Sequence, residues 1–194
     1  MKKLTREDLY SLEKYSEIRN DFRSKVMAHK KNRHLGIGPN ATLYFEDRLV
    51  MHYQIQEIMR AEKIFEIEAI NEELEAYNPL IPDGNNWKAT FMIEFTDEEK
   101  RRVALTKLTG IESKLWLKVD GFNEIVPIAD EDLERENDVK TSAVHFLRFQ
   151  LSDEMVEALK LGSQLSAGIE HPNYSHIVNP VPENILKSLI LDLD

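Results

Sequence analysis

The chain has 194 residues, of which 42% are hydrophobic and 31% are charged, and its formal net charge is -10. This length supports one substantial hydrophobic core, and the composition argues against intrinsic disorder. The absence of cysteine excludes disulfides, cysteine-ligated zinc and an iron–sulfur cluster held by this chain alone. The cofactor is otherwise unknown, and any metal would need histidine or carboxylate ligands.

The start of the chain has no apolar segment typical of a signal peptide, and no apolar run approaches the roughly 18 residues that span a bilayer. We therefore expect a cytoplasmic protein without a membrane partner. The net negative charge disfavours nucleic acid as a partner. The charge is uneven, however, because residues 1–34 hold ten Lys and Arg against five Asp and Glu, whereas the rest holds 15 against 30.

The first 86 residues are predicted to be mainly helical, with one β-hairpin. Capping residues, turn residues and apolar spacing indicate the elements in chain order. They are a helix opened by Thr5 and fading at residue 29, a hairpin over residues 34–46, a long helix capped by Asp47 and a short helix over residues 68–76.

Residues 87–194 are predicted to form a sheet with helical crossovers. The expected elements are a strand over 88–95, a helix from Thr96 to Gly110, strands over 115–120 and 124–128, an acidic connector over 130–138, a strand over 142–151, a helix over 153–161, a strand over 164–171 and a helix over 183–191. This β-α-β-β-β-α-β order resembles a ferredoxin-like layout with one extra strand. The expected fold class is α+β, in which N-terminal helices and a hairpin pack with a mostly antiparallel sheet as a single domain over residues 1–194.

Motifs of common enzyme classes are missing from the sequence. The segment Gly36-Ile-Gly-Pro-Asn-Ala41 matches a dinucleotide fingerprint in its letters, but a strand-like run follows it and Pro39 has no N–H for a phosphate. The chain also lacks a Walker loop, a nucleophile elbow and a metalloprotease motif. The sequence therefore predicts no catalytic residue, and the chain is more consistent with a binding protein than with an enzyme.

Basic side chains cluster near the end of the first helix, at Arg23, Lys25, Lys30, Lys31 and Arg33. Such a cluster is a candidate site for phosphate, a nucleotide, RNA or an acidic partner. The alternative is a solvated helix end, where cations interact favourably with the helix dipole.

The long helix carries a second candidate group, Glu57, Arg60 and Glu62. Glu57 and Arg60 are three residues apart and can pair on the surface. Glu62 falls on the apolar stripe that runs from Met51 to Phe65, where a carboxylate is costly unless it is paired or binds a ligand. An error in the helix register is the other explanation.

Two histidines, His145 and His171, fall on the apolar faces of their strands. If both strands lie in one sheet, the imidazoles share one side, and Glu62 is the carboxylate expected to complete a metal site. The alternative is that each is a hydrogen-bonded core histidine. Tyr174 and His176, in the following loop, are further candidates.

Several segments of the chain resemble a bacterial family known only as domain of unknown function 3501; they are residues 28–31, 38–47, 54–62, 77–82 and 140–149. The resemblance covers nearly the whole chain, and it supplies no catalytic residues. It implies a role in redox or peroxide metabolism, beside rubrerythrin-like proteins and iron–sulfur oxidoreductase subunits.

The leading hypothesis is a non-catalytic accessory or binding protein of redox or peroxide-stress metabolism that acts through a protein partner, such as an iron–sulfur or rubrerythrin-like protein. One alternative is an enzyme or sensor with the His/carboxylate metal site. Another is anion, nucleotide or RNA binding through residues 23–34.

Overall fold

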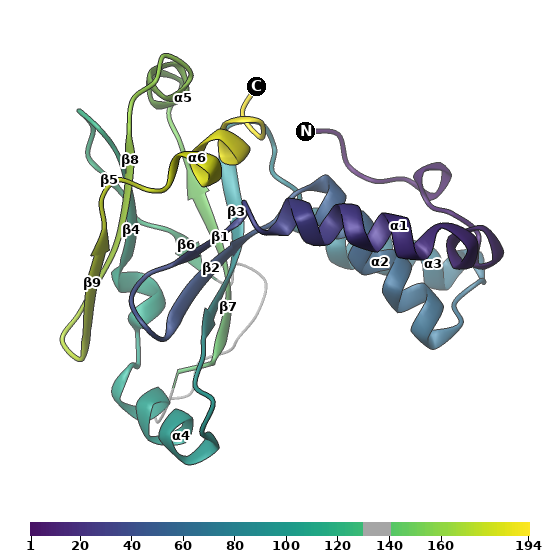
Figure 1. Ribbon diagram of the computed structural model, residues 1–194, viewed down its shortest axis with the longest axis horizontal. Helices are drawn as coiled ribbons and strands as arrows, with labels where there is room; N and C mark the ends of the chain where they lie inside the picture. Colours follow the sequence, from purple (N-terminus) through teal and green to yellow (C-terminus); the bar gives the residue numbers. More distant parts are fainter. Residues whose placement is uncertain (130–140) are drawn as a thin grey trace.

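The structure, a computed structural model that describes residues 1–129 and 141–194, consists of a β-sandwich and a helical arm that projects from it (Figure 1). The arm contains α1 (Leu12–Lys30), α2 (Arg48–Glu62) and α3 (Ile67–Tyr77). The sandwich contains all of the described strands. This mixture of helices and antiparallel sheets confirms the α+β class. The acidic connector expected over 130–138 lies outside the described residues.

Both long helices of the arm begin at a side-chain cap. Ser11 accepts a hydrogen bond from the Lys14 amide, and Asp47 accepts one from the Val50 amide at 2.8 Å, which confirms the predicted cap at Asp47. The Thr5–Asp8 capping box opens only the 3₁₀ turn η1 (Arg6–Asp8), and α1 begins seven residues after Thr5.

The late start of α1 along the chain is explained by a contact with α2. The side-chain amide of Gln56 accepts from the Tyr10 N–H at 2.6 Å and donates to the Tyr10 carbonyl at 3.3 Å. These bonds satisfy the backbone of Tyr10 outside a helix, so the chain remains extended there before α1 begins.

The sandwich has two antiparallel sheets. The first has the order β1-β2-β3-β7-β6, with bounds His34–Gly36, Ala41–Phe45, Asn86–Ile93, Val144–Gln150 and Ile128–Ala129. The second has the order β5-β4-β8-β9, with bounds Glu124–Ile125, Leu115–Val119, Leu165–His171 and Tyr174–Val178. The shorter helices are α4 (Glu98–Lys107), α5 (Asp153–Lys160) and α6 (Glu183–Ile190), with 3₁₀ turns η2 (Asn78–Leu80) and η3 (Ile111–Lys114).

The expected order of strands and helices is present, with β6 and β9 added, but the expectation of a single sheet was wrong. β3 and β7 lie in the first sheet, whereas β4 and β8 lie in the second. A ferredoxin-like sheet needs helices that cover one face, and α4 is too polar for that role because Leu105 is its one buried residue. The apolar faces of the two sheets cover each other instead.

Two separate groups of buried side chains stabilise the two parts. The sandwich core includes Phe91 and Phe149 from the first sheet and Leu117 and Ile169 from the second. The arm has its own core, made of Leu4, Val50, Met51, Ile55, Met59, Ile70, Leu74 and Ile81. Phe65, which was expected on the stripe of α2, is 69% exposed, because the helix ends at Glu62 and Lys63 turns the chain with a φ of 56°.

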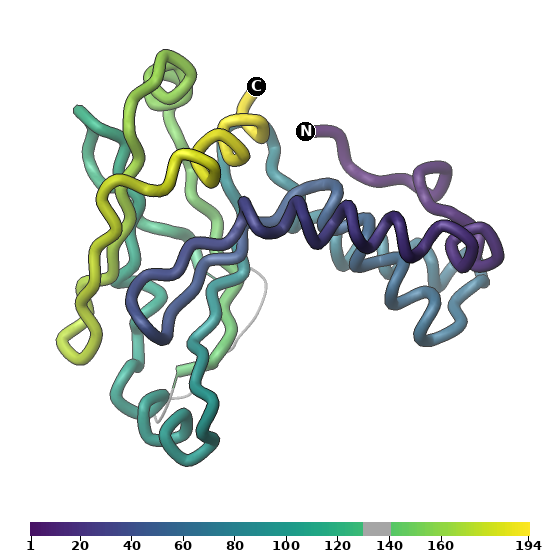
Figure 2. The backbone as a smooth tube through the Cα atoms, in the orientation of Figure 1, coloured from purple at the N-terminus to yellow at the C-terminus, as the bar shows by residue number. Residues whose placement is uncertain are grey.

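The backbone passes between the two parts where α1 leads into β1, where β2 leads into α2 and where η2 leads into β3 (Figure 2). The chain ends meet beside the passage from η2 to β3, since the Met1 amine lies 3.5 Å from the Asp194 carboxylate and the Asp194 amide donates to the Gly84 carbonyl at 2.8 Å (Figure 2). We call the region where α1, β2 and α2 meet the junction. No helix of the described segments is long and apolar enough to cross a membrane.

A close contact on the second sheet generates the first prediction. A Cβ added to Gly168 would collide with the indole ring of Trp116, which is 8% exposed on the neighbouring strand. We expect Gly168→Ala to lower the free energy of unfolding by about 1–3 kcal/mol, because the ring or the strand must shift. The quantity is measured by urea denaturation.

The matched control is Gly36→Ala, since nothing lies within 4 Å of a Cβ at that position. This change should alter the free energy of unfolding by no more than about 0.5 kcal/mol. Equal losses in the two variants would contradict the packing described for Gly168.

Candidate functional site

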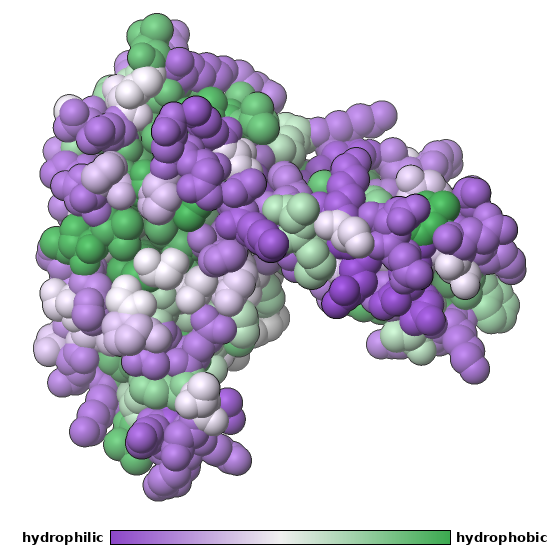
Figure 3. Space-filling model, in the orientation of Figure 1, coloured by the Kyte–Doolittle hydropathy of each residue, from purple (hydrophilic) through white to green (hydrophobic). Residues whose placement is uncertain are grey.

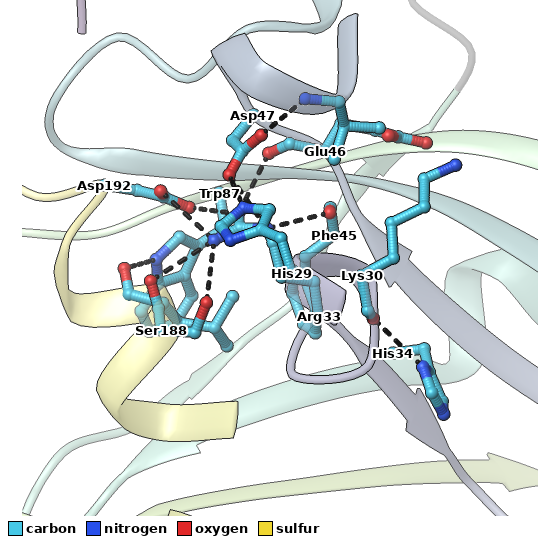
Figure 4. A network of polar contacts seen from close by, with 12 residues as sticks. His29, Lys30, Arg33, His34, Phe45, Glu46, Asp47, Trp87, Ser188 and Asp192 are labelled. Carbon is cyan, nitrogen blue, oxygen red and sulfur yellow. Dashed lines mark hydrogen bonds and ion pairs between the residues drawn. The ribbon is translucent and has the colours of Figure 1, made fainter. Parts of the chain in front are cut away.

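Arg33 lies at the junction, three residues after the end of α1, and is 2% exposed. Its guanidinium donates to the carbonyls of Phe45 and Glu46, each at 3.1 Å, and to the Asp192 carboxylate at 2.5 Å (Figure 4). It also lies 3.3 Å from Asp47 Oδ2. Arg33 therefore satisfies its donors entirely within the protein.

Asp47 connects this cluster to both helices of the arm. Its Oδ1 caps α2, whereas its Oδ2 faces Arg33 and lies 2.5 Å from the Nε2 atom of His29, near the end of α1. Asp47 is 4% exposed. One carboxylate thus fixes the end of α1 relative to the start of α2.

Asp192 contributes the sandwich side of the network, because it follows α6. Burial raises the pKa of this carboxyl to about 6, although the Arg33 charge and its hydrogen bonds act in the opposite direction. Arg33 also donates to the Ser188 carbonyl of α6 at 3.2 Å. Residues His29, Arg33, Asp47 and Asp192, which we call the junction network, join α1, α2 and α6.

The basic cluster predicted from the sequence is divided by the structure. Arg33 is buried in the junction network and cannot meet an external anion. Arg23, Lys25 and Lys31 are exposed on or just after α1, and Lys30 is half-buried. Within residues 1–129 and 141–194, these four cations form no ion pair within 4.0 Å, so they remain a candidate anion-binding group without Arg33.

The candidate residues of α2 have separate surroundings. Glu57 accepts from Tyr15 at 2.6 Å and from Arg19 at 2.7 and 2.8 Å, so its main partner is on α1. Arg60 is exposed, and its charge contributes to lowering the pKa of Glu57 after the larger effect of Arg19. Glu62 follows the buried Ile55 by seven residues and so shares its helical face, but it is the last residue of α2 and is exposed, so its carboxylate does not carry the cost of burial that made it a candidate ligand.

The two candidate histidines lie in different sheets, which corrects the premise that one sheet presents both. His145, fully buried, lies 2.9 Å from the Thr141 hydroxyl and 3.6 Å from Glu112. His171 bonds to the Thr109 carbonyl at 3.2 Å and accepts from the Asn173 amide at 3.2 Å.

The expected third ligand, Glu62, ends a helix of 15 residues, about 22 Å long, that leads away from the sandwich (Figure 1). Across the described part of the chain, no group of three or more His, Asp and Glu side chains is arranged to bind a metal. The geometry therefore offers no support for a site built from His145, His171 and Glu62.

Tyr174 and His176 belong to β9, which the sequence analysis treated as a loop. The Tyr174 hydroxyl donates to the Ile37 carbonyl at 2.7 Å and accepts from the Asn40 amide at 3.0 Å. A Cβ at Gly38 would collide with the ring of His176 and with the hydroxyl of Tyr174. These two residues therefore hold the turn of the β1–β2 hairpin in contact with the second sheet.

A groove lies in the angle between the arm and the outer face of the first sheet. Its volume is about 1120 Å³, and its apolar surface comes from both parts, namely Ala76, Tyr77, Pro79, Leu80, Ile128 and Phe146. Asp83 also lines the groove and pairs with two lysines from its lining, because the ammonium groups of Lys3 and Lys88 each lie 2.9 Å from its carboxylate. The molecule is visibly hollowed between arm and sandwich (Figure 3).

The arm side of the groove is acidic. Helix α3 carries Glu68, Glu72, Glu73 and Glu75 and contains no Lys or Arg. Glu73 and Glu75 line the groove. Burial raises the pKa of Glu73, and repulsion from Glu62 and Glu72 adds to the effect. A positive group that enters the groove would relieve this repulsion.

Sequence reasoning missed Asp192, Asp83 and the groove. Asp192 had a visible signal, since a carboxylate stands between Leu191 and Leu193 in an otherwise apolar C-terminal segment. Its partner Arg33 is 159 residues away along the chain. The groove had no such signal, because its walls come together only through the angle between the two parts.

The junction network generates the second prediction. Arg33→Met leaves Asp47 and Asp192 buried without their cation, and we expect it to lower the free energy of unfolding by about 3–5 kcal/mol at pH 8. The loss should be smaller at pH 5. Without Arg33 the raised pKa of Asp192 rises further, so a proton neutralises this carboxylate in the folded state as the pH falls.

Denaturant unfolding at both pH values measures the effect. The control Lys31→Met removes an exposed cation and should cost no more than about 0.5 kcal/mol. Adding Asp192→Asn to Arg33→Met should recover part of the loss. A loss in Arg33→Met that is equal to the control, or that grows at pH 5, would contradict the assigned charges.

Comparison with known proteins places this architecture in a family. A crystal structure described as that of a novel protein of unknown function from Burkholderia pseudomallei K96243 is 47% identical, covers 100% of both chains and has a TM-score of 0.92. No curated protein matches the chain. The model of a family described as protein of unknown function, DUF3501, matches residues 3–193. This match confirms the resemblance seen in the sequence: the chain belongs to the DUF3501 family.

Proposed function

We propose that this chain is a non-catalytic binding protein whose groove holds a segment of a protein partner. The observation that carries the proposal is the groove of about 1120 Å³ between the arm and the first sheet. Its volume slightly exceeds the roughly 300–1,000 Å³ typical of small-molecule clefts, so it suits several side chains of an extended segment.

The chemistry of the walls specifies the segment. Apolar side chains such as Tyr77 and Ile128 favour apolar groups of the partner. Lys3 and Lys88 are already paired with Asp83, whereas Glu73 and Glu75 have no ion pair within the described residues. The partner segment is therefore expected to combine apolar side chains with Lys or Arg.

The class of partner is a further part of the proposal. The family resemblance implies redox or peroxide metabolism, and the chain has no cysteine with which to ligate an iron–sulfur cluster. An electron-transfer centre would therefore belong to the partner, for which we propose an iron–sulfur or rubrerythrin-like protein. The protein described here would act as its accessory, in the cytoplasm.

The third prediction tests the groove. We expect Glu73→Lys combined with Glu75→Lys to weaken binding to a purified rubrerythrin-like protein or iron–sulfur subunit of the same organism by at least about tenfold, or 1.4 kcal/mol. Ala76→Trp should have a similar effect, because the exposed alanine lines the groove and the indole would fill it. Isothermal titration calorimetry measures both.

The matched control is Glu72→Lys, which reverses an exposed charge on α3 outside the groove lining. This variant should retain the affinity of the unsubstituted chain within about threefold. Absence of binding to either class of redox protein would refute the proposed partner. Binding that is unaffected by the groove variants would refute the proposed site.

A further inference from the structure

A second, smaller cavity lies on the outer face of the first sheet, separate from the groove in its lining residues. Its volume is about 360 Å³, and it is lined by Lys30, Tyr44, Glu46, Thr90 and Met92 together with Arg33 and Phe45. This volume is within the range of small-molecule sites in proteins.

Two opposite charges face this cavity without touching each other. Glu46 is 9% exposed, and its Oε1 accepts from the Thr90 hydroxyl at 2.7 Å. The Lys30 side chain has no ion pair within 4.0 Å among the described residues, and no dashed line reaches its ammonium in Figure 4. Burial raises the pKa of the Glu46 carboxyl. The charge of Lys30, which acts across the cavity, lowers it.

The rest of the lining is less polar or already occupied. The Tyr44 hydroxyl donates to the Glu94 carboxylate at 3.2 Å, so a ligand in the cavity would contact the ring of Tyr44 and not its hydroxyl. The guanidinium of Arg33 already donates its hydrogen bonds within the protein, to the Glu46 carbonyl and to Asp192. Met92 adds a flexible apolar side chain, which adapts to ligands of different shape.

We infer that this cavity binds a small zwitterion, an α-amino acid with an apolar side chain, whose carboxylate pairs with Lys30 and whose ammonium pairs with Glu46. A simple anion would satisfy Lys30 but would meet the buried carboxylate of Glu46, and a simple cation would meet Lys30. An α-amino acid carries both charges, on an ammonium and a carboxylate group that are bonded to the same carbon atom. Its side chain would pack against the ring of Tyr44 and against Met92.

The inference is independent of the partner proposed for the groove, and the experiment separates the two. L-leucine is titrated into the full-length chain and followed by amide NMR shifts, beside its two halves, 4-methylpentanoate without the amine and 3-methylbutylamine without the carboxylate. We expect saturable shifts at Glu46, Thr90 and Met92 with leucine, and at least about tenfold weaker binding of each half.

Two variants assign the charges. Lys30→Met should weaken leucine binding about tenfold or more and remove the preference for leucine over the amine. Glu46→Gln, which can still accept from Thr90, should remove the preference for leucine over the acid. Lys31→Met, outside the cavity, should bind leucine as the unsubstituted chain does, and so should the groove variants.

Three results would overturn the inference. They are the absence of saturable shifts at millimolar leucine, equal binding of leucine and either half, and shifts located away from the cavity. Thermal melting of each variant verifies folding. If Glu46→Gln fails to fold, the loss of preference in Lys30→Met still decides the matter.

Discussion

The burial of one guanidinium is the constraint on which this architecture depends. Arg33 is 2% exposed, and its donors reach the backbone where β2 ends, the carboxylate at the start of α2 and the carboxylate after α6. A buried arginine without partners would be very costly, so these three segments must meet at fixed positions. Such a network adds little net stability compared with apolar packing, but the directions of its hydrogen bonds restrict the geometry of the three segments. That geometry is the angle of the arm.

The sites discussed above follow from this angle. The groove has one wall on the arm, near Tyr77, and the other on the first sheet, near Phe146, and the two parts have separate hydrophobic cores. A change in the arm angle would therefore alter the groove without disturbing either core. The smaller cavity also depends on the junction, because Lys30 stands at the end of α1 and Glu46 immediately precedes the cap of α2.

Local features were readable in the sequence, whereas pairings between distant segments were not. The cap at Asp47, the hairpin and the alternation along β3 and β7 depend on neighbouring residues, and they were predicted correctly. The division into two sheets depends on which apolar faces meet. The alternation of apolar and polar residues predicts which face of each strand is buried, but it does not predict which strand or face packs against it. For the same reason His145 and His171 were assigned correctly to apolar faces but wrongly to one sheet. Both interpretations of the basic cluster place Arg33 at the surface, because the sequence does not show that its acidic partner Asp192, at the other end of the chain, lies beside it.

The distance between arm and sandwich tests the central claim most directly. Because the chain has no cysteine, spin labels can be placed on cysteines introduced at the exposed residues Lys63, in the arm, and Lys118, in the second sheet, and their separation measured by pulsed electron spin resonance. The account predicts one narrow distance distribution in the labelled parent and in Lys31→Met, and a broad one in Arg33→Met combined with Asp192→Asn. A narrow, unchanged distribution in that variant, with the sandwich folded by near-ultraviolet circular dichroism, would contradict the claim that the junction network sets the arm.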